Sequence, residues 1–297
     1  MSTSTDRRRT RRRAVMAVVC ALGLTILWSA RAARPDHGGV PVASSSSGRA
    51  ALRVAPTVGA SSSATARDSR RVALAASGPE RIAVASQPDA SAQVWPARNA
   101  EGAASLNVFL HGMCSQPEPS CAFWSDAGRE GSFLVCPAGN GRCGDRPDWR
   151  GSGAEKASYL DRVVGAVRAR YGDAIAASGD DVLIGFSRGA FVARDVIYER
   201  PGIFRGVVLI GAHLDPDPAR FLAAGVRRVV MAAGEYDGAR PAMQRAAVRM
   251  TGAGLPARYV SLGHIGHQLP ADLARILAKE IRWVRGNDRG PEKTSSL

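Results

Sequence analysis

Short apolar runs alternate with amphipathic stretches from residue 105 onward, and this alternation constrains the fold more than any other feature. Each run is rich in Val, Ile or Leu. The runs span residues 105–112, 131–139, 180–187, 204–214, 228–237 and 256–263. Strands of this kind are buried on both faces. Their alternation with helices predicts an α/β fold, a mostly parallel β-sheet of about six or more strands with helices on both faces.

Helical periodicity marks several of the intervening segments. Residues 158–172 space Leu160, Val163 and Val167 at helical intervals, and residues 188–200 stop before a proline. Together with residues 270–286, these segments are expected to be helices. In sheets of this class, functional groups gather at the carboxyl ends of the strands. Polar residues directly after a predicted strand are therefore the first candidates for a site.

The N-terminal segment, residues 1–34, is typical of an export signal. A basic run from Arg7 to Arg13 precedes an apolar stretch over residues 14–30, and Ala30 and Ala32 stand in an A-x-A arrangement. The apolar stretch is long for a signal peptide and short for a membrane span. A cleaved signal peptide and an uncleaved signal-anchor both stay open. We expect export to a periplasmic or extracellular location, with a membrane anchor if the signal is not cleaved.

Composition divides the remaining chain into three parts. Residues 35–95 are mostly Ala, Ser, Arg, Pro and Val, which predicts a low-complexity linker. Residues 96–288 carry most of the aromatic residues and long aliphatic runs, so we expect one catalytic domain there. Residues 289–297 are expected to be a flexible tail.

The formal net charge of +14 does not indicate a nucleic-acid partner. Half of it, +7, comes from eight Arg and one Asp within residues 1–34. In the predicted domain the basic residues are interleaved with acidic ones, whereas a phosphate-binding surface requires clustered positive charge. We therefore expect no nucleic-acid binding.

Four of the five cysteines lie in the predicted domain. Cys114 and Cys121, and likewise Cys136 and Cys143, are separated by seven residues. In an oxidising compartment, local disulfides Cys114–Cys121 and Cys136–Cys143 are the simplest of three possible pairings. A zinc site is the less favoured alternative, because this spacing exceeds that of structural zinc ligands.

Ser187 stands between Gly185 and Gly189, where a predicted strand ends and a predicted helix begins. This G-x-S-x-G arrangement is typical of a nucleophile elbow, a strained turn that exposes the serine Oγ and tolerates only small neighbours. The alternative is a tight turn with an uninvolved serine. The strand–turn–helix context favours the nucleophile.

At this point residues 103–286 resemble the α/β-hydrolase family, and most closely its small, lidless serine esterases of the carboxylesterase and dienelactone-hydrolase type. The resemblance implies a serine nucleophile, then an acid, then a histidine in chain order. It places the acid at Asp237, with Glu235 and Asp215 as alternatives. Asp215 is otherwise expected to be the N-cap of a following helix. The histidine is expected at His267, with His264 as the alternative.

The resemblance also implies an oxyanion hole. The segment "VFLHGMCS" is similar to the family's His-Gly element after an early strand. One backbone N–H would come from Met113 or Cys114, and the other from Arg188, the residue after the nucleophile. His111 would then hold the loop rather than transfer protons.

These residues predict an exported serine hydrolase that cleaves carboxylic esters through an acyl-enzyme. A serine peptidase, an acyltransferase and a non-catalytic, membrane-tethered binding module are the alternatives. We expect no cofactor and no metal. The expected partner is a small-molecule or polymeric ester. No long insertion separates residue 211 from the next predicted helix, so the site is expected to be open.

Overall fold

The computed structural model describes residues 68–69, 72–84, 91–177 and 180–286. The predicted export signal, most of the predicted linker and all of the predicted tail lie outside these residues. The described residues all belong to one unit of the chain, Thr57–Leu297.

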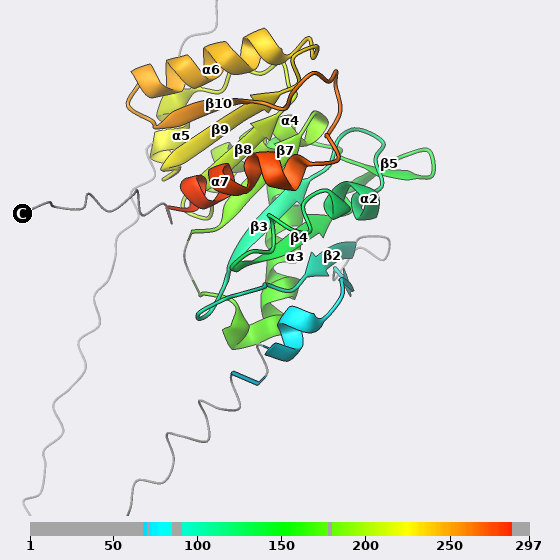
Figure 1. The fold of residues 1–297 in the computed structure, drawn as a ribbon. Helices are drawn as coiled ribbons and strands as arrows, with labels where there is room; N and C mark the ends of the chain where they lie inside the picture. The colour runs from blue at the N-terminus through cyan, green and yellow to red at the C-terminus, as the bar shows by residue number, and fades with distance from the viewer. Residues whose placement is uncertain (1–67, 70–71, 85–90, 178–179, 287–297) are drawn as a thin grey trace, which may run out of the picture. The chain divides into compact units, whose positions relative to one another are not determined.

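An eight-stranded sheet forms the centre of the fold, in the order β1-β2-β4-β3-β7-β8-β9-β10 (Figure 1). All neighbouring strands are parallel except β1 with β2 and β2 with β4. The mostly parallel sheet predicted from the sequence is thus confirmed. The strands are β1 (Glu80–Ala83), β2 (Ser91–Trp95), β3 (Ser105–Leu110), β4 (Ser132–Pro137), β7 (Val182–Phe186), β8 (Gly206–Ile210), β9 (Arg228–Ala233) and β10 (Ala257–Ser261).

Helices cover both faces of the sheet, as predicted. In Figure 1, α7 crosses in front of the central strands and α6 lies beside β9 and β10. The helix α4 follows the nucleophile segment and packs on β3, β7 and β8. From β3 onward the helices are α2 (Pro117–Ala122), α3 (Gly153–Tyr171), α4 (Arg188–Glu199), α5 (Pro218–Ala223), α6 (Arg240–Gly252) and α7 (Leu273–Arg285), and a short 3-10 helix spans Gly172–Ala174. Residues 72–76, before β1, are also helical.

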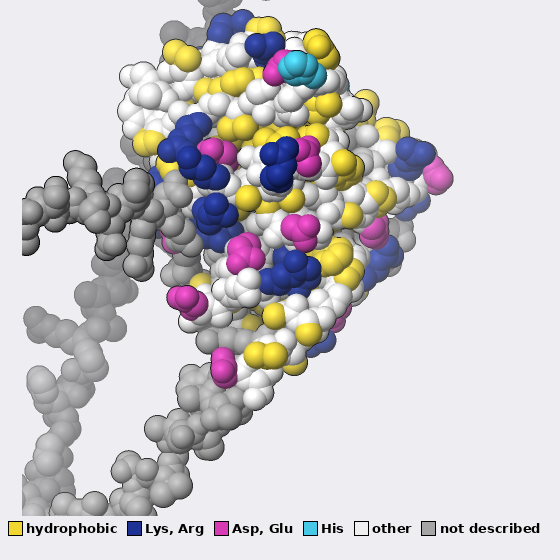
Figure 2. Space-filling view, in the orientation of Figure 1, with side chains coloured by type: hydrophobic (Ala, Val, Ile, Leu, Met, Phe, Trp, Pro, Cys, Tyr) yellow, Lys and Arg dark blue, Asp and Glu magenta, His cyan; other side chains and the backbone are white. Residues whose placement is uncertain are grey.

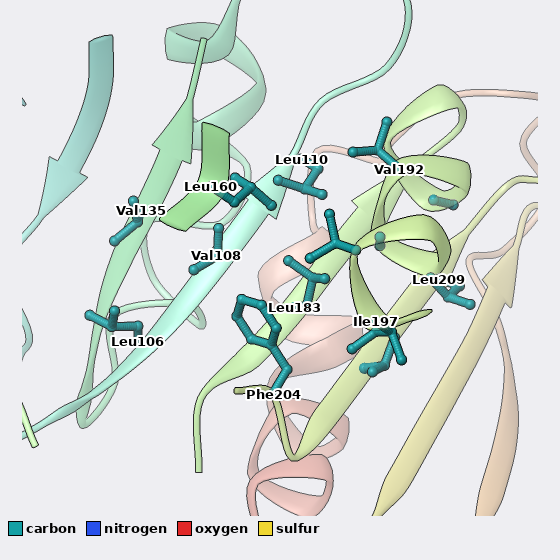
Figure 3. Close-up of a cluster of buried hydrophobic side chains, with 14 of the residues drawn as sticks. Leu106, Val108, Leu110, Val135, Leu160, Leu183, Val192, Ile197, Phe204 and Leu209 are labelled. Atoms are coloured by element: carbon teal, nitrogen blue, oxygen red, sulfur yellow. The ribbon is translucent and has the colours of Figure 1, made fainter. Parts of the chain in front are cut away.

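The core lies on both sides of the sheet because alternate residues of each central strand point to opposite faces. In β7, Leu183 joins the cluster beneath α3 and α4, and Ile184 joins the cluster beneath α7. Figure 3 shows the first of these clusters. Its labelled side chains come from several strands and helices: Leu106, Val108, Leu110, Val135, Leu160, Leu183, Val192, Ile197, Phe204 and Leu209. This two-sided burial explains the continuous apolar runs of the sequence.

The folded part begins earlier than the composition predicts. Residues 80–83 and 91–95, which were assigned to the linker of residues 35–95, form β1 and β2. These antiparallel strands lie at the edge of the sheet, and only alternate residues are deeply buried, namely Ile82, Ala92 and Val94. Because an edge strand of this kind needs few large apolar residues, its composition resembles that of a linker.

The two disulfides pair differently from the prediction. Cys114 is bonded to Cys143, and Cys121 to Cys136. The local pairing was wrong because β3 and β4 are adjacent parallel strands, and the segments at their carboxyl ends are therefore neighbours. Which cysteines pair is thus determined by which strands lie side by side in the sheet, and not by their separation in the sequence.

Acidic and basic side chains are interspersed over the face of the molecule that carries α7 (Figure 2). Among the described residues, no helix is both long enough and apolar enough to cross a membrane.

Candidate active site

Ser187 occupies a strained turn between β7 and α4, with φ 54° and ψ −118°. A positive φ is uncommon for a residue with a side chain. A Cβ at Gly185 would lie 2.4 Å from the Gly189 carbonyl oxygen, and a Cβ at Gly189 would lie 2.0 Å from the Leu110 carbonyl oxygen. Both glycines are therefore required for α4 to pack closely on the ends of β7 and β3. The tight turn predicted from the G-x-S-x-G pattern is present.

His267 contacts Ser187 on one side and Asp237 on the other. Its Nε2 lies 2.9 Å from Ser187 Oγ, and its Nδ1 lies 2.9 Å from Asp237 Oδ2. The Phe186 ring stacks on the imidazole at 5.2 Å between centroids. In the chain, His267 lies 80 residues from Ser187 and 30 residues from Asp237. The structure thus brings together three of the residues selected from the sequence, in one hydrogen-bonded chain.

Asp237 is held rigidly in the segment after β9. Its side chain is only 5% exposed, and its Oδ1 accepts a 2.9 Å hydrogen bond from the Ala239 N–H. The second oxygen, Oδ2, faces His267. A buried carboxylate with both oxygens engaged favours the imidazole tautomer that carries its proton on Nδ1 and leaves Nε2 free to accept from Ser187.

The alternative residues make other contacts. His264 Nε2 lies 2.9 Å from Glu235 Oε2, so these two alternatives pair with each other. Asp215 forms an ion pair with Arg249. Asp215 is also not the N-cap of α5, as one interpretation of the sequence suggested. Asp217 takes that position and accepts a hydrogen bond from the Ala219 N–H, because Pro218 at the first helical position places the cap directly before it.

The loop after β3 passes beside the serine. A Cβ at Gly112 would lie 3.4 Å from the Ser187 Cβ. Met113 follows, and its N–H donates to no acceptor among the described residues. Arg188 is the first residue of α4, so its N–H lacks an intrahelical partner. Within the part of the chain that the structure describes, both N–H groups selected from the sequence are without an acceptor, and both lie in segments that adjoin Ser187.

Buried polar contacts fix this loop. His111 is fully buried, with its Nδ1 2.7 Å from the Gly112 carbonyl oxygen and its Nε2 2.8 Å from the Ala138 carbonyl oxygen. The Trp149 Nε1–H donates a 3.0 Å hydrogen bond to the His111 carbonyl oxygen. His111 thus ties the loop to neighbouring segments, in agreement with the holding role that the sequence suggested.

The sequence did not reveal one structural part of the site, the segment over residues 138–150, here called the β5–β6 arm. It contains the antiparallel strands β5 (Gly141–Cys143) and β6 (Arg146–Asp148). Its base is anchored by Tyr159 of α3, whose hydroxyl oxygen accepts a 3.1 Å hydrogen bond from the Gly139 N–H. Burial raises the pKa of Tyr159 to about 12, so the phenol remains neutral. The Gly-Asp turn between Cys143 and Arg146 is the sequence signal for this hairpin.

Cys114, Cys143 and Asp148 place their side-chain ligand atoms within 4.8 Å of one another. Both sulfur atoms belong to the disulfide. This cluster therefore offers one free ligand, the Asp148 carboxylate, in place of the three or four that a bound transition metal uses.

The fold is similar to that of solved esterase structures. The Pyrobaculum calidifontis esterase aligns with a TM-score of 0.52 at 13% identity, over 79% of this chain and 95% of that one. The Bacillus cereus carboxylesterase aligns with a TM-score of 0.51 at 15% identity, over 68% and 96%. Esterase PE8 aligns with a TM-score of 0.50 at 20% identity, over 64% and 97%.

No protein-family model matches the sequence, and comparison with curated proteins finds no match. At these low identities, the structural likeness concerns the fold. The order and direction of the strands agree with it, as does the turn at Ser187 between β7 and α4. The chain therefore has the α/β-hydrolase fold that its sequence resemblance implied.

Proposed function

We propose that this protein is an exported serine hydrolase that cleaves carboxylic esters, with Ser187, His267 and Asp237 as its catalytic triad. The observation that carries the proposal is the hydrogen-bonded chain from Ser187 Oγ through the imidazole of His267 to Asp237 Oδ2, with 2.9 Å at each step. A strained, glycine-flanked serine at the start of this chain supports the same role. Export rests on the N-terminal sequence and on the two disulfides.

The geometry accounts for the steps of ester cleavage. Ser187 Oγ attacks the carbonyl carbon of the ester while its proton passes to His267 Nε2. The imidazolium then donates that proton to the leaving alcohol oxygen as the carbon–oxygen bond breaks, and an acyl-serine remains. A water molecule attacks the acyl-serine with His267 again accepting the proton. The imidazolium then returns this proton to Ser187 Oγ as the bond between Oγ and the acyl carbon breaks, which releases the acid and regenerates the serine, while the Asp237 carboxylate stabilises each imidazolium.

The Met113 and Arg188 N–H groups are the proposed oxyanion donors. Both lie in segments adjoining Ser187, and neither is used in the hydrogen bonding of its own loop or helix. Such donors stabilise the charge that develops on the carbonyl oxygen in the transition state, and the loss of one typically lowers kcat by about 10²- to 10³-fold.

The surroundings of the serine suit an accessible ester. The His267 side chain is 50% exposed, and Met113 and Tyr236, which adjoin Gly112 and Asp237 in the chain, are 61% and 72% exposed. Only residues 211–217 connect β8 to α5, so the chain carries no large insertion at this point. Small esters, or ester groups on the surface of a polymer, therefore fit the site best. The solved structures of similar fold are named esterases and a carboxylesterase.

The first experiment treats the folded, oxidised protein from residue 35 onward with a fluorophosphonate probe, alongside Ser187→Ala. We expect the parent to be labelled and the variant to remain unlabelled, because only an activated serine attacks the phosphorus. Hydrolysis of p-nitrophenyl esters of graded acyl length then measures ester cleavage, and matched anilides measure amide cleavage.

His267→Ala and His264→Ala provide the internal comparison. The first should abolish labelling and ester hydrolysis, and the second should retain both, because His264 contacts Glu235 and not Ser187. A folded parent that neither labels nor hydrolyses any ester would overturn the proposal. Faster cleavage of anilides than of esters would instead indicate a peptidase.

A further inference from the structure

We propose that the Cys114–Cys143 disulfide is a positioning device for the oxyanion hole, because it fastens the loop that carries Met113 to the β5–β6 arm. This inference rests on the proposed esterase function, in which the Met113 and Arg188 N–H groups are the oxyanion donors. It adds two residues, Cys114 and Cys143, whose effect on the reaction is exerted through Met113.

The loop that carries Met113 needs external support. Cys114 has φ 50°, in the left-handed region that residues with a side chain rarely adopt. Such a conformation is strained and persists only where the surroundings enforce it. This torsion orients the Met113–Cys114 peptide group, so the restraint on Cys114 fixes the end of the segment in which the Met113 N–H lies.

The β5–β6 arm supplies that restraint at two places. The Cys114–Cys143 bond holds the residue next to Met113, and the Trp149 Nε1–H binds the His111 carbonyl oxygen at 3.0 Å. The arm is itself closed by a pair of hydrogen bonds between Asn140 and Arg150, of 2.9 and 3.0 Å. The loop is therefore fastened to a hairpin that has its own internal pairing.

The same arm also contacts Arg188, the residue that provides the second proposed donor. The Arg188 guanidinium donates a 2.8 Å hydrogen bond to the Trp149 carbonyl oxygen and lies 3.4 Å from the carboxylate of Asp148. Asp148 is buried, so this ion pair holds the arm against the start of α4. The arm thus connects the loop of one proposed donor to the residue that provides the other.

The second disulfide lacks these connections. Cys121 and Cys136 are fully buried and join α2 to β4, within the core cluster beneath α7. Neither residue adjoins a proposed donor. The chain therefore contains a matched control, a second long-range disulfide with a role in folding and none in the site.

The test compares Cys114→Ser/Cys143→Ser with Cys121→Ser/Cys136→Ser, using p-nitrophenyl acetate and a phenylboronic acid. Both variants should unfold at lower temperature, because each loses a cross-link that restricts the unfolded chain. Only Cys114→Ser/Cys143→Ser should have a lower kcat, by about 10- to 100-fold, with KM nearly unchanged. This loss is smaller than that caused by removing an oxyanion donor, because the Met113 N–H is displaced and not removed. The boronic acid forms a tetrahedral adduct on serine, so its inhibition constant should rise by a similar factor.

The outcomes separate this inference from the proposed function. If the parent itself hydrolyses no ester, the proposed function fails. If the parent is active, and the folded Cys114→Ser/Cys143→Ser variant keeps the parent's kcat and boronate affinity, the positioning role is wrong and the esterase proposal stands. Equal losses of kcat in both double variants would also overturn it, because they would indicate a general effect of disulfide loss.

Reduction of the unmodified protein provides an independent test. Cys114 and Cys143 are partly exposed, whereas Cys121 and Cys136 are not. A dithiol reductant should therefore reduce the first disulfide selectively in the native protein, forming two cysteine thiols and its own cyclic disulfide. Mass spectrometry after alkylation identifies the reduced pair. Activity should fall as Cys114 and Cys143 become accessible to alkylation, and it should return when the disulfide is reoxidised. Full activity with this pair reduced would contradict the proposal.

Discussion

Individual side chains in this site are held by one local contact and one distant contact. Asp237 illustrates this, because one of its oxygens accepts from the Ala239 N–H and the other faces His267 Nδ1. The hydrogen bond from the Ala239 N–H fixes the orientation of the carboxylate, so the contact with Nδ1 can fix the orientation of the imidazole. An acid in this position acts through hydrogen-bond direction as much as through charge.

Asp237→Asn should therefore lower kcat by roughly 10⁴-fold at neutral pH with little loss of stability. The amide nitrogen would donate to His267 Nδ1, which forces the proton onto Nε2, the atom that must accept from Ser187. Steady-state hydrolysis of p-nitrophenyl acetate measures the effect. Asp215→Asn is the control, since Asp215 pairs with Arg249 and should not change kcat. Retention of more than a tenth of the parent's kcat by Asp237→Asn would argue against the proposed triad.

Gly211 is a second position at which one added carbon atom would disturb the site. It has φ 59°, and a Cβ there would lie 3.0 Å from Asp237 Oδ2 and 3.3 Å from the His267 ring. Gly211→Ala should lower both stability and kcat, because the methyl group strains the backbone and displaces the acid–base pair. The backbone part is roughly 1–2 kcal/mol.

Gly254→Ala separates the two effects. Gly254 has φ 86°, and a Cβ there would have no neighbouring atom within 4 Å, so its substitution strains the backbone without touching the site. Urea unfolding and ester hydrolysis on both variants give the comparison. Both variants should lose stability to a similar extent, and only Gly211→Ala should lose kcat. An unchanged kcat in Gly211→Ala would contradict a catalytic role for the Asp237–His267 pair that Gly211 adjoins.

At the scale of elements, the edge of the sheet is joined to α3 by polar contacts. Glu80 of β1 accepts hydrogen bonds of 2.7 Å from Arg170 Nε and 2.9 Å from the Tyr171 hydroxyl. The hydrogen bond from Arg170 is the main cause that holds the pKa of Glu80 below its ordinary value of 4.5. Burial, followed by the contact with Glu80, raises the pKa of Tyr171. The ionised carboxylate therefore stabilises the docking of β1 on α3.

A lowered carboxylate pKa contributes stability above the pKa of the unfolded chain, near 4.5, and this contribution is lost as pH falls through the folded value. Glu80→Gln should thus be less stable than the parent at pH 7, by at most about 1 kcal/mol because the pair is partly exposed. The difference should shrink as the pH falls below 4.5. Urea unfolding of both proteins from about pH 7 to about pH 3.5 measures it, and a difference that does not depend on pH would contradict the assignment.

The elements also show why parts of the fold could be predicted. The central strands were predictable because burial on both faces requires continuous apolar runs, as in Val182–Phe186 and Gly206–Ile210. The edge strands β1 and β2 were not, since alternate burial of Ile82, Ala92 and Val94 leaves a composition like that of a linker. The β5–β6 arm has three residues in each strand, too few for a periodic signal.

At the scale of the whole molecule, chain order along a parallel sheet allowed the residues of the proposed triad to be selected from the sequence. Ser187, Asp237 and His267 each follow a strand whose carboxyl end lies at the same edge. The disulfide pairing was not recognisable in this way. It depends on β4 lying beside β3, and nothing in the spacing of Cys114, Cys121, Cys136 and Cys143 reports which strands are neighbours.

The site and the described core lie within residues 68–286, so we expect residues 1–56 to contribute nothing to catalysis. A chain that begins at Thr57 should have the same kcat and unfolding temperature as one that begins at residue 35. Thermal unfolding and ester hydrolysis on the two chains test this. A lower unfolding temperature for the shorter chain would show that the segment before Thr57 supports the folded unit.

The position of His267 has a consequence for biosynthesis. If the chain is exported from its N-terminal end, as proposed, both cysteine pairs emerge first, then Ser187, then Asp237, and the proposed base, His267, last. Partly translocated chains can therefore oxidise their cysteines while the serine still has no proton acceptor. Under the proposed function, hydrolytic activity begins only when the segment after β10 has reached its place, so the nascent chain carries no active nucleophile before then.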